Sequence, residues 1–297
     1  MAIVEGVFLR GPDRWAAACR RPDGDVAVVA GPLPAWYRQW SAIPLARGIV
    51  ALAESLSLGV RALVWSGGLQ RTDNGGGHPS RVARRHLLAN LLPALVLSIG
   101  LFFAGPAAAA HALAGSAGAL TAALAETGLR IALVIAYLVG VGRIADARRL
   151  FQYHGAEHQV VALHEAGLVP SVEAARSQPR SHPRCGTTFF VIVVFVSAIA
   201  HAGLAVFGSA PLPALLAGRI ALVPLAAAVA YEVLSLIGRT ASSSPFRSAL
   251  RPGLSLQALT VREPDDRQLE VALLALAAAT EPAAAPVPAP AFASAPA

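Results

Sequence analysis

The residue types best suited to chemistry in this sequence lie at His154, Glu157 and His158. Two histidines four positions apart in a helix project from the same side, so one metal ion can bind both imidazoles. Glu157 directly precedes His158 and is near enough to act as general base for a water on that ion. The spacing, His-x-x-Glu-His, reverses the common zincin order. The pattern predicts a metal site on a helix, and its alternative is a solvated helix face on which two histidines fall four apart by chance.

A second group of metal-binding residue types follows at His182 and Cys185, and Glu232 lies further along the chain. Glu232 interrupts an apolar segment, where an ionisable group is costly and usually faces protein or a watery cavity. Two histidines, one glutamate and a water would make an open, catalytic zinc site, whereas three histidines and a cysteine would close the shell and make it structural. The sequence leaves both ligand sets open.

Glu165 lies on the same side of the expected helix as the two histidines, but it is seven residues beyond His158. That spacing corresponds to about 10.5 Å along a helix axis, which is too far for comfortable binding of one shared ion. We therefore expect Glu165 to support a neighbouring ligand or a second ion, or to be a solvated carboxylate at the end of the helix.

Composition indicates a membrane protein. Hydrophobic residues make up 55% of the 297 residues, and the mean hydropathy is +0.57, which exceeds what soluble domains show. The net charge of +7 comes from arginines scattered around apolar segments, so it does not indicate nucleic-acid binding. The two cysteines are far apart in the chain, which fits reduced thiols facing the cytosol better than a disulfide framework.

Four apolar segments are candidate membrane spans. They flank a polar centre that carries the histidines, and arginines cluster before the first span, in the centre and after the last span. The positive-inside rule then places the polar centre and both termini in the cytosol of a bacterial inner membrane. The spans are predicted at 87–104, 129–142, 187–207 and 220–237. The second is so short that Arg130 and Arg143 must snorkel to opposite surfaces.

The remaining segments complete a mainly α-helical, polytopic bundle. Short strands at 4–9, 15–20 and 26–30, joined by an Asp-Gly turn, predict a small N-terminal β-rich cytosolic module. The apolar stretch 43–66 carries charges every seven residues, which predicts an amphipathic helix at the membrane interface. The predicted divisions are the module at 1–34, the interfacial helix and loop at 35–85, a span pair at 86–142, the cytosolic site segment at 143–186, a second span pair at 187–238, a cytosolic segment at 239–275 and a disordered Pro/Ala tail at 276–297.

Several blocks together resemble one family, the YqhQ-like bacterial membrane proteins, which are labelled predicted metal-dependent enzymes. The blocks are Val4–Val7 with Arg10–Pro12, Pro44–Gly48, Tyr153–His158, His182–Gly186, Tyr231–Glu232, and Pro252–Gly253 through Glu270–Ala272. They cover nearly the whole chain apart from its tail. The resemblance implies a cytosol-facing polar site built from His154, Glu157, His158, His182, Cys185 and Glu232. One departure is the start, because members carry a longer glycine-containing lead than Met1-Ala2-Ile3.

These observations predict a membrane enzyme that depends on a divalent metal, which we expect to be zinc. The expected reaction is hydrolysis of a peptide or lipid-linked substrate by a water on the metal, at the cytosolic face and in contact with membrane lipid. The competing hypothesis is a non-catalytic membrane scaffold or ion-handling protein, in which the same residues hold a structural metal or a polar network. No nucleic-acid partner is expected, and the sequence leaves the oligomeric state open.

Overall fold

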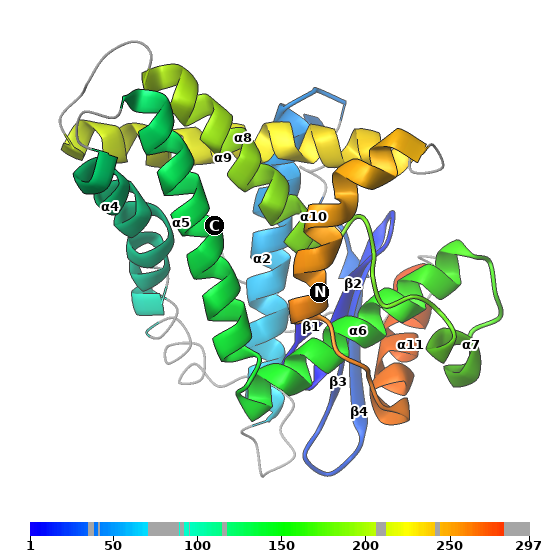
Figure 1. The fold of residues 1–297 in the computed structure, drawn as a ribbon. Helices are drawn as coiled ribbons and strands as arrows, with labels where there is room; N and C mark the ends of the chain where they lie inside the picture. Colours follow the sequence, from blue (N-terminus) through cyan, green and yellow to red (C-terminus); the bar gives the residue numbers. More distant parts are fainter. Residues whose placement is uncertain are drawn as a thin grey trace.

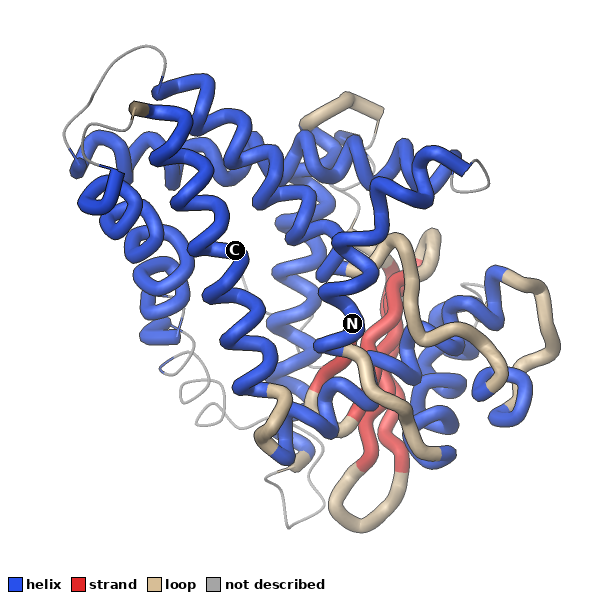
Figure 2. The backbone as a smooth tube through the Cα atoms, in the orientation of Figure 1, coloured by secondary structure: helices blue, strands red, loops and turns tan. Residues whose placement is uncertain are grey.

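The computed structural model describes residues 1–34, 39–40, 42–70, 89, 92–94, 96–114, 118–205, 212–240 and 244–281. The protein is mainly helical, with one small sheet near its N-terminus. Apolar helices gather on one side of the molecule, while the sheet forms the other side together with α6 (Ala145–Glu165), α7 (Val172–Arg176) and α11 (Asp266–Thr280) (Figures 1 and 2). The segments that carry the predicted site lie where these two parts meet.

The N-terminal sheet has four antiparallel strands in chain order, which confirms the predicted β-rich module. Gly24, in the turn that follows β3, has a φ of 97°, as expected from the Asp-Gly pair. The first predicted strand begins two residues later than expected, because Val4 and Glu5 form a turn and Glu5 has a φ of 51°. The strands are β1 (Ala2–Ile3), β2 (Gly6–Arg10), β3 (Arg14–Arg20) and β4 (Val26–Pro32).

Both faces of the sheet are covered by helices, because side chains alternate between the two faces along each strand. One face packs Val7, Ala16 and Ala18 against α6 (Ala145–Glu165) and α11 (Asp266–Thr280). The other face packs Phe8 and Trp15 against α2 (Ala46–Leu69). The sheet is thus the middle layer of a three-layer sandwich, and it holds α6 in a fixed position relative to α2.

The apolar helices form the other part of the molecule. They are α2, the π-helical turn η1 (Gly100–Ala104) continued by α4 (Gly105–Ala114), α5 (Ala119–Val141), α8 (Gly186–Ala205), α9 (Leu212–Thr240) and α10 (Ser244–Thr260). Among the described residues, three stretches are long and apolar enough to cross a membrane: Ala46–Leu69, Leu92–Ala110 and Leu120–Val141. Shorter apolar helices lie at Gly186–Ala200 and Ile220–Leu236. These stretches support a membrane protein.

The helix at the second predicted span is longer than expected. Helix α5 begins at Ala119, ten residues before the predicted start, because the Ala-rich stretch before Leu129 continues the helix. Arg130 does not snorkel to a surface: its side chain is 3% exposed and pairs with Glu126, one turn earlier in the same helix, at 2.6 Å. Helix α2 is also long enough to cross a membrane, so its interfacial position stays a prediction.

Some predicted features lie outside the described residues. The predicted first span begins in the gap that precedes residue 89, and the polar loop before it falls mostly in the same gap. The disordered Pro/Ala tail was predicted to begin at 276, but α11 continues to Thr280, because alanines there extend the helix; residues beyond 281 lie outside the described part of the chain. Helix α11 begins at the end of the acidic stretch 263–266, and the Asp265 carboxylate caps it by accepting the backbone N–H of Gln268 at 2.8 Å.

Candidate metal centre

Helix α6 supplies both histidines of the predicted pattern. Asp146 in its first turn complements the helix dipole. Tyr153, Ala156, Val160 and Leu163 recur at helical spacing and are buried in the core that α6 shares with the sheet. His154 and His158 follow a neighbouring stripe, and their ring centroids are 4.4 Å apart. Burial of the apolar stripe therefore fixes the side toward which both imidazoles project.

Each imidazole is oriented by a backbone carbonyl. The Nδ1 atom of His154 is 2.9 Å from the carbonyl oxygen of Thr260, and Nδ1 of His158 is 2.6 Å from that of Arg180. A carbonyl only accepts hydrogen bonds, so each Nδ1 carries the proton and donates it. In the neutral imidazole each Nε2 is then left with a lone pair, and Nε2 is the atom that gains a proton when the ring is protonated. Metal-binding histidines are commonly held in this way, with one nitrogen donating to a carbonyl and the other facing the ion.

Cys185 completes a group of three ligands. Its Sγ atom lies 3.2 Å from Nε2 of His154, and the ligand atoms of His154, His158 and Cys185 all lie within 4.8 Å of one another. Zinc binds nitrogen at about 2.1 Å and sulfur at about 2.3 Å, so tetrahedral ligands lie about 3.6 Å apart. The three atoms therefore need only small movements to share one ion. The donor set, two imidazoles and one thiolate, is one that zinc prefers.

The electrostatics of the group favour a thiolate. Burial raises the pKa of the Cys185 thiol, but hydrogen bonds from His154 and His158 and their positive charge outweigh burial and bring its pKa to about 5. Burial lowers the pKa of His154, yet the hydrogen bond with Cys185 and the charge of Glu157 outweigh burial and raise it. The metal-free group therefore already favours a thiolate beside a protonated imidazole, and a thiolate is the form that binds metals.

Glu157 lies at the wall of a cavity of about 630 Å³ that also exposes His154, His158 and Cys185. Its carboxylate forms an ion pair with the α-amino group of Met1. Burial alone would raise its pKa, but the charges of the amino group and the two histidines outweigh burial and lower it. The Oε2 atom of Glu157 is buried and has no hydrogen-bond partner within the described part of the chain. A buried acceptor of this kind calls for a proton donor such as water.

His182 lies beside the group without belonging to it. Its ring centroid is 5.8 Å from that of His158, and its Nε2 atom is 3.3 Å from both carboxylate oxygens of Glu165. Its Nδ1 atom accepts the backbone N–H of Arg184 at 3.3 Å. Both ring nitrogens are therefore engaged with protein. Glu165 therefore supports His182, which is not one of the three candidate ligands, and its expected role beside a ligand or a second ion stays a prediction.

Glu232 is engaged with α2. Its Oε1 atom accepts hydrogen bonds from Nε of Arg47 at 2.8 Å and from the backbone N–H of Leu45 at 3.0 Å, and its Oε2 atom pairs with the same guanidinium. It is absent both from the three-ligand group and from the residues that line the 630 Å³ cavity. The ion pair satisfies the charge inside the apolar helix and joins α9 to α2.

Three residues important for the site were not expected from the sequence. Thr260 and Arg180 orient the histidines through their carbonyls, and a backbone carbonyl has no signature in a sequence. Gly155 leaves room for the segment that follows α10, since a Cβ there would lie 2.1 Å from the carbonyl oxygen of Arg262. A glycine inside a helix costs stability relative to alanine, so its position between the two histidines is the one available signal.

Comparison with known proteins gives a family without an assigned activity. A family described as "Protein of unknown function (DUF1385)" matches residues 43–282. The chain is also similar to the "Uncharacterized protein YqhQ" of Bacillus subtilis (strain 168), with 29% identity over 286 residues, or 92% of this chain and 88% of that protein. No solved structure matches the chain. The family match covers most of the chain and agrees with the resemblance of its motifs, so this protein belongs to the YqhQ-like family, DUF1385.

Proposed function

We propose that this protein is a metal-dependent membrane hydrolase whose ion is held by His154, His158 and Cys185. The observation that carries the proposal is the convergence of three ligand atoms within 4.8 Å at the wall of a cavity. Two of them come from α6, and the third comes from the turn before α8. Three protein ligands leave one position of a tetrahedral shell open, which is typical of catalytic rather than structural zinc sites.

The residues present fit a zinc ion. In both histidines Nδ1 donates to a backbone carbonyl, so a bound ion would take Nε2 in place of a proton, and Cys185 favours its thiolate form. A bound zinc ion would supply Lewis acidity and lower the pKa of a water ligand towards neutrality. Such an ion would also replace the hydrogen bond between His154 and Cys185 as the link that holds these side chains together.

Glu157 is the proposed general base. Its Oε2 atom is buried, lacks a partner among the described residues and belongs to a residue that lines the cavity. The lowered pKa of Glu157 keeps the carboxylate ionised at neutral pH, so it can accept a proton from a water in the cavity. His182 stays out of the ligand set in this proposal. Its hydrogen bond to Glu165 and the pairing of Glu165 with Arg184 hold His182 and Arg184 in place, and both of these residues line the cavity.

The proposed setting is the cytosolic face of a bacterial inner membrane. The support is the sequence pattern, because arginines concentrate in the segment between the second and third predicted spans and near both ends of the span region. Helix α6 and the turn at Cys185 both belong to that central segment. The substrate would then be a peptide or a lipid-linked ester or amide near the membrane surface.

Metal analysis of the purified full-length protein tests the centre. We expect about one zinc per chain in the wild type and a loss of metal in His158→Ala. His164→Ala is the matched control, because His164 lies in the same helix but is exposed and should leave the metal content unchanged. Equal metal content in both variants, or no metal in the wild type, would exclude a centre at these residues.

Cobalt substitution then separates catalysis from structure. An open site gives a cobalt spectrum that changes when small anions such as azide compete for the water position, whereas a closed site gives an invariant spectrum. The competing hypothesis, a non-catalytic scaffold or ion-handling protein with a polar network, has one observation in its favour. The distance of 3.2 Å between His154 and Cys185 is also that of a hydrogen bond which needs no ion. An invariant spectrum or a metal-free wild type would favour that hypothesis.

A further inference from the structure

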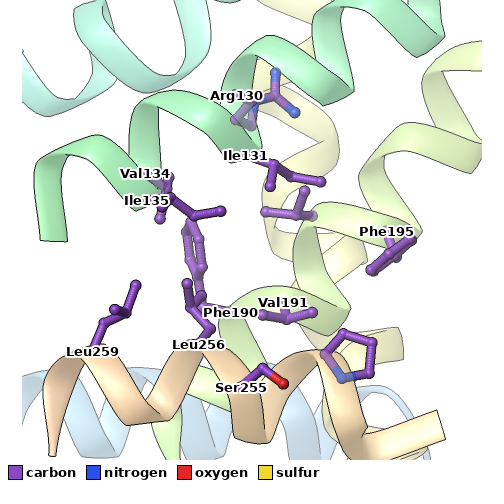
Figure 3. A pocket seen from close by; sticks show the side chains of 12 residues that line it. Arg130, Ile131, Val134, Ile135, Phe190, Val191, Phe195, Ser255, Leu256 and Leu259 are labelled. Carbon is purple, nitrogen blue, oxygen red and sulfur yellow. The ribbon is translucent and has the colours of Figure 1, made fainter. Parts of the chain in front are cut away.

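A second cavity, of about 340 Å³, lies among the apolar helices (Figure 3). Side chains from α5, α8 and α10 point into it, and all but a few of the lining residues are aliphatic or aromatic. Its volume falls within the range of small-molecule sites, which are mostly apolar and have few polar groups. The proposed hydrolase chemistry makes no use of it.

The cavity opens toward the surface of α5 that would face lipid. Ile131 and Ile135 line it and are 37% and 41% exposed, and Phe195 on α8 is 48% exposed. Helix α5 is one of the stretches long and apolar enough to cross a membrane. In a bilayer, lipid hydrocarbon surrounds this opening. The group available to enter the cavity is therefore an aliphatic lipid chain.

The charged end of the cavity is already neutralised. Arg130 lies there, but its guanidinium pairs with Glu126 at 2.6 Å and donates to the carbonyl oxygen of Phe102 at 2.9 Å. The same group stacks over the ring of Phe103 at 5.2 Å. This end therefore offers no charge for a headgroup. A lipid in the cavity would place its polar end at the opposite side.

The opposite side of the cavity adjoins the candidate metal centre. Leu259 lines the cavity, and the next residue, Thr260, holds His154 through its carbonyl oxygen. On α8, Thr187 lines the 630 Å³ cavity and Phe190 lines the apolar one. Residues three apart lie on the same side of a helix and about 4.5 Å apart along its axis. The two cavities therefore follow one side of α8 in succession.

We propose that the apolar cavity binds the hydrocarbon chain of a lipid-linked substrate and presents its polar end to the centre formed by His154, His158 and Cys185. The inference rests on the proposed function for the identity of that centre. It narrows the substrate class from a peptide or lipid-linked group to a molecule with at least one aliphatic chain. The scissile bond would lie near the junction between chain and headgroup, because that junction is the part that reaches Leu259.

Photo-crosslinking tests the cavity directly. The full-length protein is reconstituted into phosphatidylcholine vesicles that contain a phospholipid with a diazirine on one acyl chain, and labelled peptides are mapped. We expect label on α10 at 252–259. Val194 of α8 also lines the cavity. Val194→Trp, which fills the cavity, should reduce that label about tenfold, a change that corresponds to about 1.4 kcal/mol of binding. Ile199→Trp is the matched control, because Ile199 lies on the same helix but is 74% exposed.

Each outcome supports the cavity proposal or overturns it. Equal labelling of 252–259 in both tryptophan variants would overturn it, as would labelling of exposed residues such as Ile199 with none at 252–259. If Val194→Trp does not fold, Ile135→Trp at the opening replaces it. Metal content separates the two proposals. Labelling that persists in a protein without metal refutes the metal centre alone, and normal metal with no labelling at 252–259 refutes the lipid cavity alone.

Discussion

Substitution of Gly155 by alanine gives a sharp test of how the candidate centre is built. The segment that joins α10 to α11 crosses α6 at this glycine, where Phe151 accepts a backbone hydrogen bond from Arg262 at 2.9 Å. A Cβ at Gly155 would lie 2.1 Å from the carbonyl oxygen of Arg262, which is 0.9 Å inside the 3.0 Å limit that real contacts respect. The obstacle is backbone, so one of the two segments must move.

The expected cost combines two opposing effects. Overpacking costs about 1–3 kcal/mol, and the backbone obstacle places Gly155→Ala in the upper part of that range, about 2–3 kcal/mol, whereas alanine in a helix gains about 1 kcal/mol over glycine. We therefore expect Gly155→Ala to lower the free energy of unfolding by about 1–2 kcal/mol. Displacement of the crossing segment also removes the Thr260 carbonyl from His154. Loss of such an outer contact typically weakens metal binding about 10- to 100-fold.

Thermal unfolding and competitive zinc titration of the purified protein measure these two effects. Gly186→Ala is the control, because this glycine adjoins Cys185 but a Cβ there meets nothing within 4 Å. We expect the control to unfold no earlier than the wild type and to bind zinc equally well. If Gly155→Ala unfolds at the wild-type temperature and keeps its zinc affinity, the crossing of α6 by the Arg262 segment is not as described.

Three further predictions follow from single contacts. In metal-free protein, iodoacetamide should modify Cys185 at a rate that falls as the pH drops through about 5, because the pKa of this thiol is about 5 and only the thiolate reacts. Cys19 should stay unmodified near neutral pH, because burial raises its pKa to about 12. Faster labelling of Cys19 would contradict the buried sheet. Glu232→Gln should cost about 1.5–3 kcal/mol of stability through the weakened pair with Arg47 and leave the metal in place, whereas loss of metal would identify Glu232 as a ligand after all. Asp265→Ala should cost about 1 kcal/mol through loss of the helix cap, as measured by chemical denaturation, and no change would argue against the capping box.

Sequence spacing predicted the part of the site that lies within one helix. Four residues separate His154 from His158, and helical geometry alone then places both imidazoles on one side. The rise along the helix also predicted that Glu165 lies too far from the two histidines to bind the same ion. These inferences succeed because the rise and turn of a helix are fixed by its backbone, whatever lies around it.

The choice among His182, Cys185 and Glu232 depended instead on tertiary packing. All three are plausible zinc ligands, and all come from elements distant from α6 in the sequence. The structure brings Cys185 to the histidines, pairs His182 with Glu165 and pairs Glu232 with Arg47. The path of the chain after α7 and after α10 decides which of these pairs forms. The carbonyls of Arg180 and Thr260, which orient the two histidines, lie on or next to the same two segments.

The extent of the helices was harder to predict than their existence. The span at 129–142 was predicted too short because Arg130 was taken as a membrane boundary. A buried i,i+4 ion pair with Glu126 removes the reason to stop there, since both charges are satisfied within the helix. Apolar composition alone does not reveal such a pair.

The packing of helices on both faces of the sheet affects the order in which the chain folds during synthesis. The strands before residue 33 are synthesised first, yet one of their faces is covered by α11, whose residues follow more than 230 positions later. Contacts so remote in sequence form slowly, and half-covered strands tend to aggregate meanwhile. During translation, α2 can shield only the opposite face, so the earliest segment to leave the ribosome is among the last to reach its native state. Truncation before α11 should therefore damage the start of the protein more than its membrane helices.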